Sequence, residues 1–257
     1  MLILLPPSEG KSPASAGPPL RLDAMSYPSL TATRTRVLDA LIRLCEGRTA
    51  TATRVLDLGP TQHGDVALNA GLRHHPCAPA IEVYTGVLYE SLDATSLTPA
   101  ARARLDQHVA IASALWGLVR PSDIIPAYRL SGGATLPRVG GIATAWRPAI
   151  REVLRATSGL VVDMRSSTYV ALGPVPEERD GESVTVRVLT ERNGRLITVS
   201  HHNKATKGLL VRSLATSRRV PSTIDELVSV LERAGHRLEV NSSAGGRAPT
   251  LDVIIDS

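Results

Sequence analysis

The sequence lacks the features that mark several special classes of protein. It has no phenylalanine, two tryptophans and five tyrosines, so its core has to be built from leucine, valine, isoleucine and alanine. Its two cysteines, Cys45 and Cys77, are too few for a disulfide framework. No run of about 18 apolar residues predicts a transmembrane helix, and no basic leader segment precedes residues 2–5. We therefore expect a cytoplasmic protein with reduced thiols and no membrane partner.

Lysine is also scarce, and its positions are informative. The chain has 29 basic residues against 24 acidic ones, a net charge of +5, but its only lysines are Lys11, Lys204 and Lys207. These three lie in two short motifs, whereas every other basic residue of the chain is an arginine. The pattern indicates that an ammonium group is needed at these positions; chance is the alternative.

The remaining composition is that of a globular protein, with 257 residues of which 43% are hydrophobic and 21% charged. The hydrophobic pattern predicts strands at 2–5, 160–164, 184–188, 196–200, 237–240 and 251–255. It predicts helices at 36–46, 65–72, 98–115, 146–156, 205–216 and 223–234. Asn193-Gly194 predicts a hairpin turn. No linker divides the chain, so we expect an α/β (mixed α+β) fold: a single compact domain over residues 1–257, with a mixed β-sheet flanked by helices.

The positive charge is concentrated in two windows. Residues 192–224 contain seven basic side chains and no acidic one, and residues 124–151 contain four arginines and no acidic residue. Such concentration is typical of a surface that binds polyanions. The alternative is that these side chains point in different directions once the chain is folded.

A short polar motif follows the first predicted strand. Ser8-Glu9-Gly10-Lys11 resembles the end of a P-loop, but Pro6 and Pro7 have no N–H groups to offer a phosphate. The Ser8-x-x-Lys11 spacing also matches penicillin-recognising enzymes, but their other motifs are missing. What remains is a loop at the carboxyl end of a strand that presents Ser8, Glu9 and Lys11 to a cleft. A capped turn with an exposed lysine is the alternative.

The second lysine motif, residues 201–208, joins a predicted strand to a helix. Lys204 and Lys207 are three residues apart and can share a helix face, where they would add charge to an anion site. Two solvated lysines are the alternative. Histidines at 74–75 and 201–202 are metal-ligand types without metal-binding spacing, so we expect no metal site and no cofactor.

Residues 116–130 hold a cluster of polar side chains: Arg120, Asp123, Tyr128 and Arg129. The segment fits either a helix-hairpin-helix element that grips phosphates or a turn stiffened by an Arg120–Asp123 ion pair. Composition alone favours the second interpretation.

Taken in order, these motifs resemble the YaaA family of peroxide-stress proteins (UPF0246). The resemblance covers nearly the whole chain and rests on residues 1–5, 84–89, 115–123, 128–130, 163–169, 193–194 and 204–208. It implies a cytoplasmic, single-domain α/β protein of the oxidative-stress response, with a basic cleft, a helix-hairpin-helix element and affinity for double-stranded DNA. It implies no established reaction.

The sequence departs from better-known members at several positions. Ser131 and Thr168 stand where those members carry glutamate, and Lys207 stands where they carry arginine. The opening loop also differs, but it keeps its lysine. A chemical or metal-binding role for the two missing carboxylates is therefore in doubt, whereas phosphate binding needs only the cations.

Two hypotheses follow for the function. The first is non-specific binding of double-stranded DNA in a cleft lined by Lys11, Arg120, Arg129, Lys204 and Lys207. The alternative is an enzyme acting on a small anionic, nucleotide-like substrate in the same cleft, with polar groups drawn from Ser8, Glu9, Asp123, Tyr128, Asp163, Ser166 and Tyr169. A deep pocket where Lys11, Lys204 and Glu9 converge favours the enzyme, and an open groove favours DNA.

Overall fold

The computed structural model describes residues 1–179, 181–192, 195–197, 200–241 and 248–256. The predicted turn at Asn193-Gly194 lies outside these residues, although the strands on either side of it pair antiparallel. Among the described residues, no helix is both long and apolar enough to cross a membrane.

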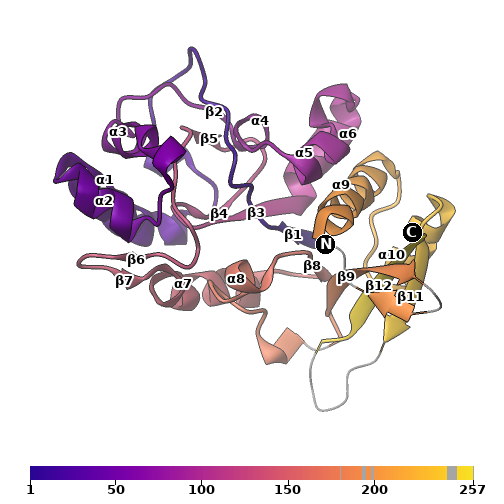
Figure 1. The fold of residues 1–257 in the computed structure, drawn as a ribbon. Coiled ribbons are helices and arrows are strands. Elements are labelled where there is room, and N and C mark those ends of the chain that lie inside the picture. The colour runs from indigo at the N-terminus through magenta and orange to yellow at the C-terminus, as the bar shows by residue number, and fades with distance from the viewer. Residues whose placement is uncertain (180, 193–194, 198–199, 242–247, 257) are drawn as a thin grey trace.

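The fold is built on one mixed β-sheet (Figure 1). Its strands run in the order β11-β12-β9-β8-β1-β3-β4, and β10 pairs with β9. The strands of this sheet are β1 (Leu2–Leu5), β3 (Val109–Ser113), β4 (Gly117–Val119), β8 (Val161–Asp163), β9 (Ser183–Arg192), β10 (Arg195–Ile197), β11 (Arg237–Asn241) and β12 (Thr250–Asp256). Two small antiparallel pairs lie outside it: β2 (Ala78–Pro79) with β5 (Ile124–Ile125), and β6 (Thr135–Leu136) with β7 (Gly140–Gly141).

The middle of the sheet is parallel and buried, and strand β1 lies within it, between β8 and β3. Every residue of β1, β3 and β8 is buried, which is why these segments are apolar up to the last residues of β3 and β8, Ser113 and Asp163. Ile3 pairs with Val109 of β3 on one side and with Val162 of β8 on the other. The chain thus leaves β1 in one direction and later returns to its opposite side. Such a reversal of strand order opens a crevice at the carboxyl ends of the strands, here between β1 and β8.

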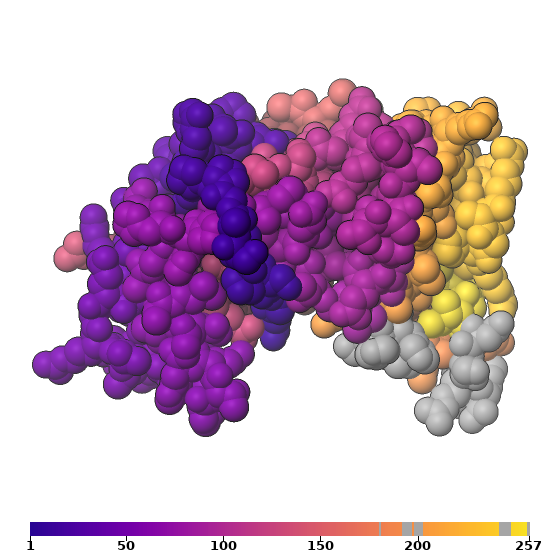
Figure 2. Space-filling view, turned by 90° about the horizontal axis from the view of Figure 1, so that it is seen from above, coloured from indigo at the N-terminus to yellow at the C-terminus, as the bar shows by residue number. Residues whose placement is uncertain are grey.

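Helices cover the sheet and extend it at one end (Figure 1). Helices α5, α6 and α9 pack together on one side of the sheet, with α7 and α8 on the other. The N-terminal helices and the C-terminal strands occupy opposite ends of the molecule, as the view from above also shows (Figure 2). The helices are α1 (Thr31–Glu46), α2 (Thr49–Val55), α3 (Gly64–Ala70), α4 (Ala80–Val83), α5 (Val87–Leu92), α6 (Pro99–His108), α7 (Ile142–Ala156), α8 (Ser167–Val170), α9 (Ser200–Thr216) and α10 (Ile224–Arg233). Sheet and helices form the single compact α/β domain that the sequence predicts.

The prediction of one helix over 98–115 is wrong in its second half. Helix α6 begins as expected, with the Thr98 hydroxyl accepting a hydrogen bond from the Ala101 N–H, but it ends at His108. The apolar run 109–113 is strand β3, buried between β1 and β4. Pro148 also lies inside α7 rather than near its start.

The helix-hairpin-helix interpretation of residues 116–130 is likewise wrong, because that segment contains β4, a turn and β5. Asp123 shapes the turn: its carboxylate accepts hydrogen bonds from the Arg120 N–H (2.8 Å) and from the Ser26 N–H and hydroxyl. The Arg120 guanidinium instead donates to the backbone oxygens of Gln107 and Val109. Asp123 therefore stiffens the turn through backbone groups, not through the expected ion pair.

Candidate functional site

A pocket of about 790 Å³ opens at the crevice between β1 and β8. The loops that follow these two strands form part of its wall, together with the start of α5, part of β9 and the N-terminal half of α9. Six basic side chains line the pocket against one carboxylate, that of Glu9. The basic residues are Lys11, Arg129, Arg165, Arg187, Lys204 and Lys207.

Most of the residues singled out in the sequence meet in this pocket. Its lining includes Ser8, Glu9, Lys11, Arg129, Ser166, Tyr169, Lys204 and Lys207. Four others are not part of the lining: Arg120, Asp123, Tyr128 and Asp163. Arg120 and Asp123 belong to the turn described above, whereas Tyr128 and Asp163 support lining residues from behind.

Lys11 is held at the pocket wall by its own loop. Its backbone forms a bridge with Tyr84, and its Nζ donates to the carbonyl oxygens of Ser8 (2.9 Å) and Glu9 (3.3 Å). The same Nζ lies 4.3 Å from the centre of the Tyr128 ring. Burial lowers the pKa of Lys11 to about 7, and the positive charge of Arg129 adds to this effect.

A buried hydrogen-bonded chain of hydroxyl groups lies behind Lys11. The Tyr128 hydroxyl is 2.7 Å from the Ser113 hydroxyl and 3.0 Å from that of Tyr84. Burial raises the pKa of Tyr84 and of Tyr128, so both phenols stay neutral. Tyr128 therefore supports Lys11 from behind and is not itself in a position to contact a ligand.

The Ser8 hydroxyl is used within the loop. It donates to the Gly10 carbonyl oxygen (2.5 Å) and accepts a hydrogen bond from the Thr85 N–H (3.0 Å). The motif thus combines parts of its two interpretations, a capped turn and a loop that presents polar groups to a cleft. Ser8 caps the turn, and the turn presents Lys11 to the cleft.

Arg129 brings a second cation to the same wall. Its backbone is fixed by Asn69, whose side-chain amide bonds both the N–H and the carbonyl of Arg129. Its guanidinium lies 3.7 Å from the carboxylate of Glu9, which is otherwise exposed. Burial raises the pKa of the neighbouring Tyr169 to about 12, so this phenol is neutral as well.

Helix α9 contributes the other two lysines, in different environments. The Nζ of Lys207 is buried and donates to the Met164 carbonyl oxygen (2.9 Å), whereas Lys204 is exposed. Burial lowers the pKa of Lys207, and the negative charge of Asp163 partly opposes that shift. The two lysines therefore offer one interior and one peripheral contact to an anion.

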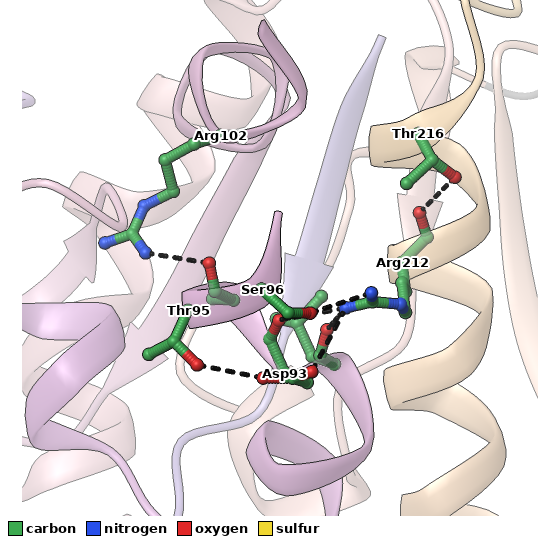
Figure 3. A network of polar contacts seen from close by, with 8 residues as sticks. Asp93, Thr95, Ser96, Arg102, Arg212 and Thr216 are labelled. Carbon is green, nitrogen blue, oxygen red and sulfur yellow. Dashed lines mark hydrogen bonds and ion pairs between the residues drawn. The ribbon is translucent and has the colours of Figure 1, made fainter. Parts of the chain in front are cut away.

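The position of α9 is fixed by its packing on α5. A side chain at Gly208 would collide with the Leu88 carbonyl oxygen, so glycine is required for this close approach. Figure 3 shows the polar contacts one turn further on, where Arg212 donates to the backbone oxygens of Leu92 and Asp93 and to the Ser96 hydroxyl. These contacts hold Lys204 and Lys207 at the pocket.

Two arginines of the pocket, Arg165 and Arg187, are not among the predicted site residues. Arg165 makes a buried, bidentate ion pair with Asp163, with N–O distances of 2.9 and 2.7 Å. Its third nitrogen donates to the Gly173 carbonyl oxygen. Arg187 of β9 makes a similar pair with Asp252 of β12, although its own side chain is 52% exposed. The Asp-x-Arg spacing at the end of a strand was a usable signal for the first pair. The Arg187–Asp252 pair joins residues 65 positions apart, so no local sequence pattern indicates it.

The two positions at which the sequence lacks an expected glutamate, Ser131 and Thr168, both line the pocket. Neither side chain carries a charge, so Glu9 is the one acidic residue of the lining. Within the described ranges, no three histidine, cysteine or acidic side chains lie close enough together to hold a metal ion.

Comparison with known proteins agrees with this arrangement of motifs. Residues 1–241 match the sequence model of a family described as "Peroxide stress protein YaaA". A UPF0246 protein of Streptomyces coelicolor is 44% identical over 99% of this chain and 98% of its own length. A UPF0246 protein of Corynebacterium efficiens is 42% identical over 99% of this chain and all of its own length. The chain therefore belongs to the YaaA (UPF0246) family of peroxide-stress proteins.

Proposed function

We propose that this peroxide-stress protein binds a small anionic ligand, a phosphate-bearing molecule of nucleotide size, in the pocket between β1 and β8. The observation that carries the proposal is the charge of the wall: six basic side chains line a cavity of about 790 Å³. Two of them, Arg165 and Arg187, are neutralised by buried aspartates, which leaves four cations against the carboxylate of Glu9. Pockets of roughly 300–1,000 Å³ are typical of sites for small molecules and cofactors.

The placement of the lysines favours a small ligand over a duplex at this site. Lys207 is buried and Lys11 is half-buried, so of the three lysines only the peripheral Lys204 is open to the phosphates of a rigid duplex. A small anion can enter and reach the interior lysines. Apolar lining residues such as Pro7, Val87 and Leu130 offer it an uncharged surface as well.

Titration with ADP tests this proposal. We expect calorimetry to show saturable binding, and Arg129→Gln to weaken it by roughly tenfold or more, because a hydrogen bond to a charged group contributes about 1.5–3 kcal/mol. Arg233→Gln, on the exposed face of α10, is the matched control and should leave the affinity unchanged. Equal affinities for the wild type and Arg129→Gln, or no heat at ADP concentrations of about a millimolar, would contradict the proposal.

A second candidate function, binding of double-stranded DNA, is favoured by a different surface. Helices α1 and α2 are joined by two residues, Gly47 and Arg48. Beside this connection, Arg43, Arg48 and Arg138 line a groove of about 330 Å³. In the described part of the chain, none of these arginines is paired with a carboxylate. We propose α1–α2 as the helix-hairpin-helix element that the family resemblance implies, with these arginines on DNA phosphates.

The two surfaces predict different results in a DNA-binding assay. If DNA binds at α1–α2, Arg48→Ala with Arg138→Ala should weaken duplex binding and reduce the slope of log K against log salt by about 2, because each phosphate contact contributes about 0.9. Lys204→Ala with Lys207→Ala should then change duplex affinity little. Anisotropy measured at two salt concentrations decides between the sites, and an affinity independent of salt would overturn DNA binding at both.

A further inference from the structure

Lys11 differs from an ordinary lysine in having no counter-ion. Within the described residues, no carboxylate lies within ion-pairing distance of its Nζ; the polar partners are the carbonyl oxygens of Ser8 and Glu9. The one acidic side chain of the pocket, Glu9, lies against Arg129 instead. The amine is therefore held in the wall of a ligand pocket by neutral groups.

The contacts also fix the orientation of this amine. A neutral amine has two N–H groups and one lone pair. The Ser8 and Glu9 carbonyl oxygens, at 2.9 and 3.3 Å, can accept both N–H groups, which leaves the lone pair directed away from the loop. The Nζ itself lies over the buried Tyr84 and Tyr128 rings, 5.5 and 4.3 Å from their centres, which fixes its position further.

The charges of the pocket favour the neutral form of this amine. Burial and Arg129 lower the pKa of Lys11 to about 7, against the opposing effects of Glu9 and Asp65. At neutral pH about half of the Lys11 amines then carry a free lone pair, compared with less than about one in a thousand for an exposed lysine. A desolvated lysine beside another cation is the environment in which lysine acts as a nucleophile.

We propose that Lys11 forms an imine with a carbonyl compound that bears a phosphate or carboxylate group. The inference rests on the proposed function, since the other pocket cations would hold the anionic group of that ligand. The Nζ lone pair attacks the carbonyl carbon and forms the C–N bond, while the C=O π electrons move to oxygen. That oxygen then leaves as water with the two protons that Nζ gives up. No oxidant or reductant is needed.

Lys207 is the alternative nucleophile in the same pocket, and the geometry disfavours it. It is 8% exposed, its Nζ donates to the Met164 carbonyl oxygen, and the nearby Asp163 carboxylate favours its charged form. Lys204 is exposed to water. Lys11 alone combines access to the pocket with a desolvated, counter-ion-free amine.

Because the chain has only three lysines, labelling of lysine side chains can be assigned to single residues. Pyridoxal 5′-phosphate, an aldehyde that carries a phosphate, would be incubated with the protein at about pH 7 and reduced with borohydride, and the labelled peptides mapped. The protein used is Arg233→Lys, because that substitution adds an exposed reference lysine on α10. We expect labelling at Lys11 to exceed that of the reference lysine by at least about tenfold and to be lost in Lys11→Arg.

The alcohol analogue, pyridoxine 5′-phosphate, separates this inference from the proposed function. It carries the same phosphate but cannot form an imine, so calorimetry measures binding alone. If the alcohol binds and Lys11 is labelled no faster than the reference lysine, the imine proposal is overturned and the binding proposal stands. If neither compound binds, both are overturned. Because the mapping is done on a protein that retains Lys11, the result does not depend on whether Lys11→Arg folds.

Discussion

Replacing Arg165 with methionine should lower the free energy of unfolding by about 3–5 kcal/mol, because it leaves a buried carboxylate without its partner. Arg165 is 5% exposed, and two of its nitrogens bond the two oxygens of Asp163. Its remaining nitrogen holds the Gly173 carbonyl oxygen. Urea denaturation monitored by circular dichroism would measure the loss. We also expect weaker anion binding, because Arg165 fixes the loop after β8 that forms part of the pocket wall.

Two further variants identify the origin of this effect. Arg155→Met breaks ion pairs with Glu152 and Glu178, whose side chains are 69% and 63% exposed, and it should cost far less because water solvates the remaining carboxylates. Adding Asp163→Asn to Arg165→Met should recover part of the lost stability, because the buried negative charge is then removed. A loss in Arg165→Met no larger than that in Arg155→Met would show that the buried pair is not a main support of the site.

The features predicted well from the sequence are those encoded locally. The run Leu2–Leu5 reads as a buried strand because all four of its side chains are apolar. The proline-rich loop after it, and the strand–helix junction near Lys204, place lysines at the carboxyl ends of strands. The pocket lies at the carboxyl end of β1, as expected for Lys11. Strand β10 runs antiparallel to β9, so it is the packing of α9 against α5 that brings Lys204 and Lys207 to the same pocket.

The features that were missed depend on contacts between distant parts of the chain. Residues 109–113 fit a helix by sequence, but pairing of Ile111 with Leu5 on one side and Val119 on the other makes them a strand. Arg120 is a DNA contact by prediction from the sequence, but its guanidinium binds backbone oxygens of the α6–β3 junction. The partner of Arg187 lies on a strand 65 residues later. No local pattern specifies these pairings.

Replacing Lys11 with methionine should stabilise the protein below about pH 7, by an amount on the order of a few kcal/mol. The pKa of Lys11 is lowered to about 7 in the folded protein by burial and by Arg129, whereas the unfolded chain keeps the usual lysine value. Below pH 7 the native state must carry a desolvated charge, and stability is reduced by the full amount. As pH rises above 7, the unfolded state binds a proton that the native state does not, so wild-type stability rises toward that of the variant.

Thermal denaturation at about pH 6 and about pH 10 measures this difference, since the advantage of Lys11→Met should be large at the first pH and small at the second. Lys204→Met is the matched control, because it removes an exposed lysine from the same pocket. That substitution should change the melting temperature little, and equally at both pH values. A stabilisation by Lys11→Met that is the same at both pH values would reflect packing of the methionine side chain. It would show that Lys11 keeps its proton throughout, and so would also remove the basis for its action as a nucleophile.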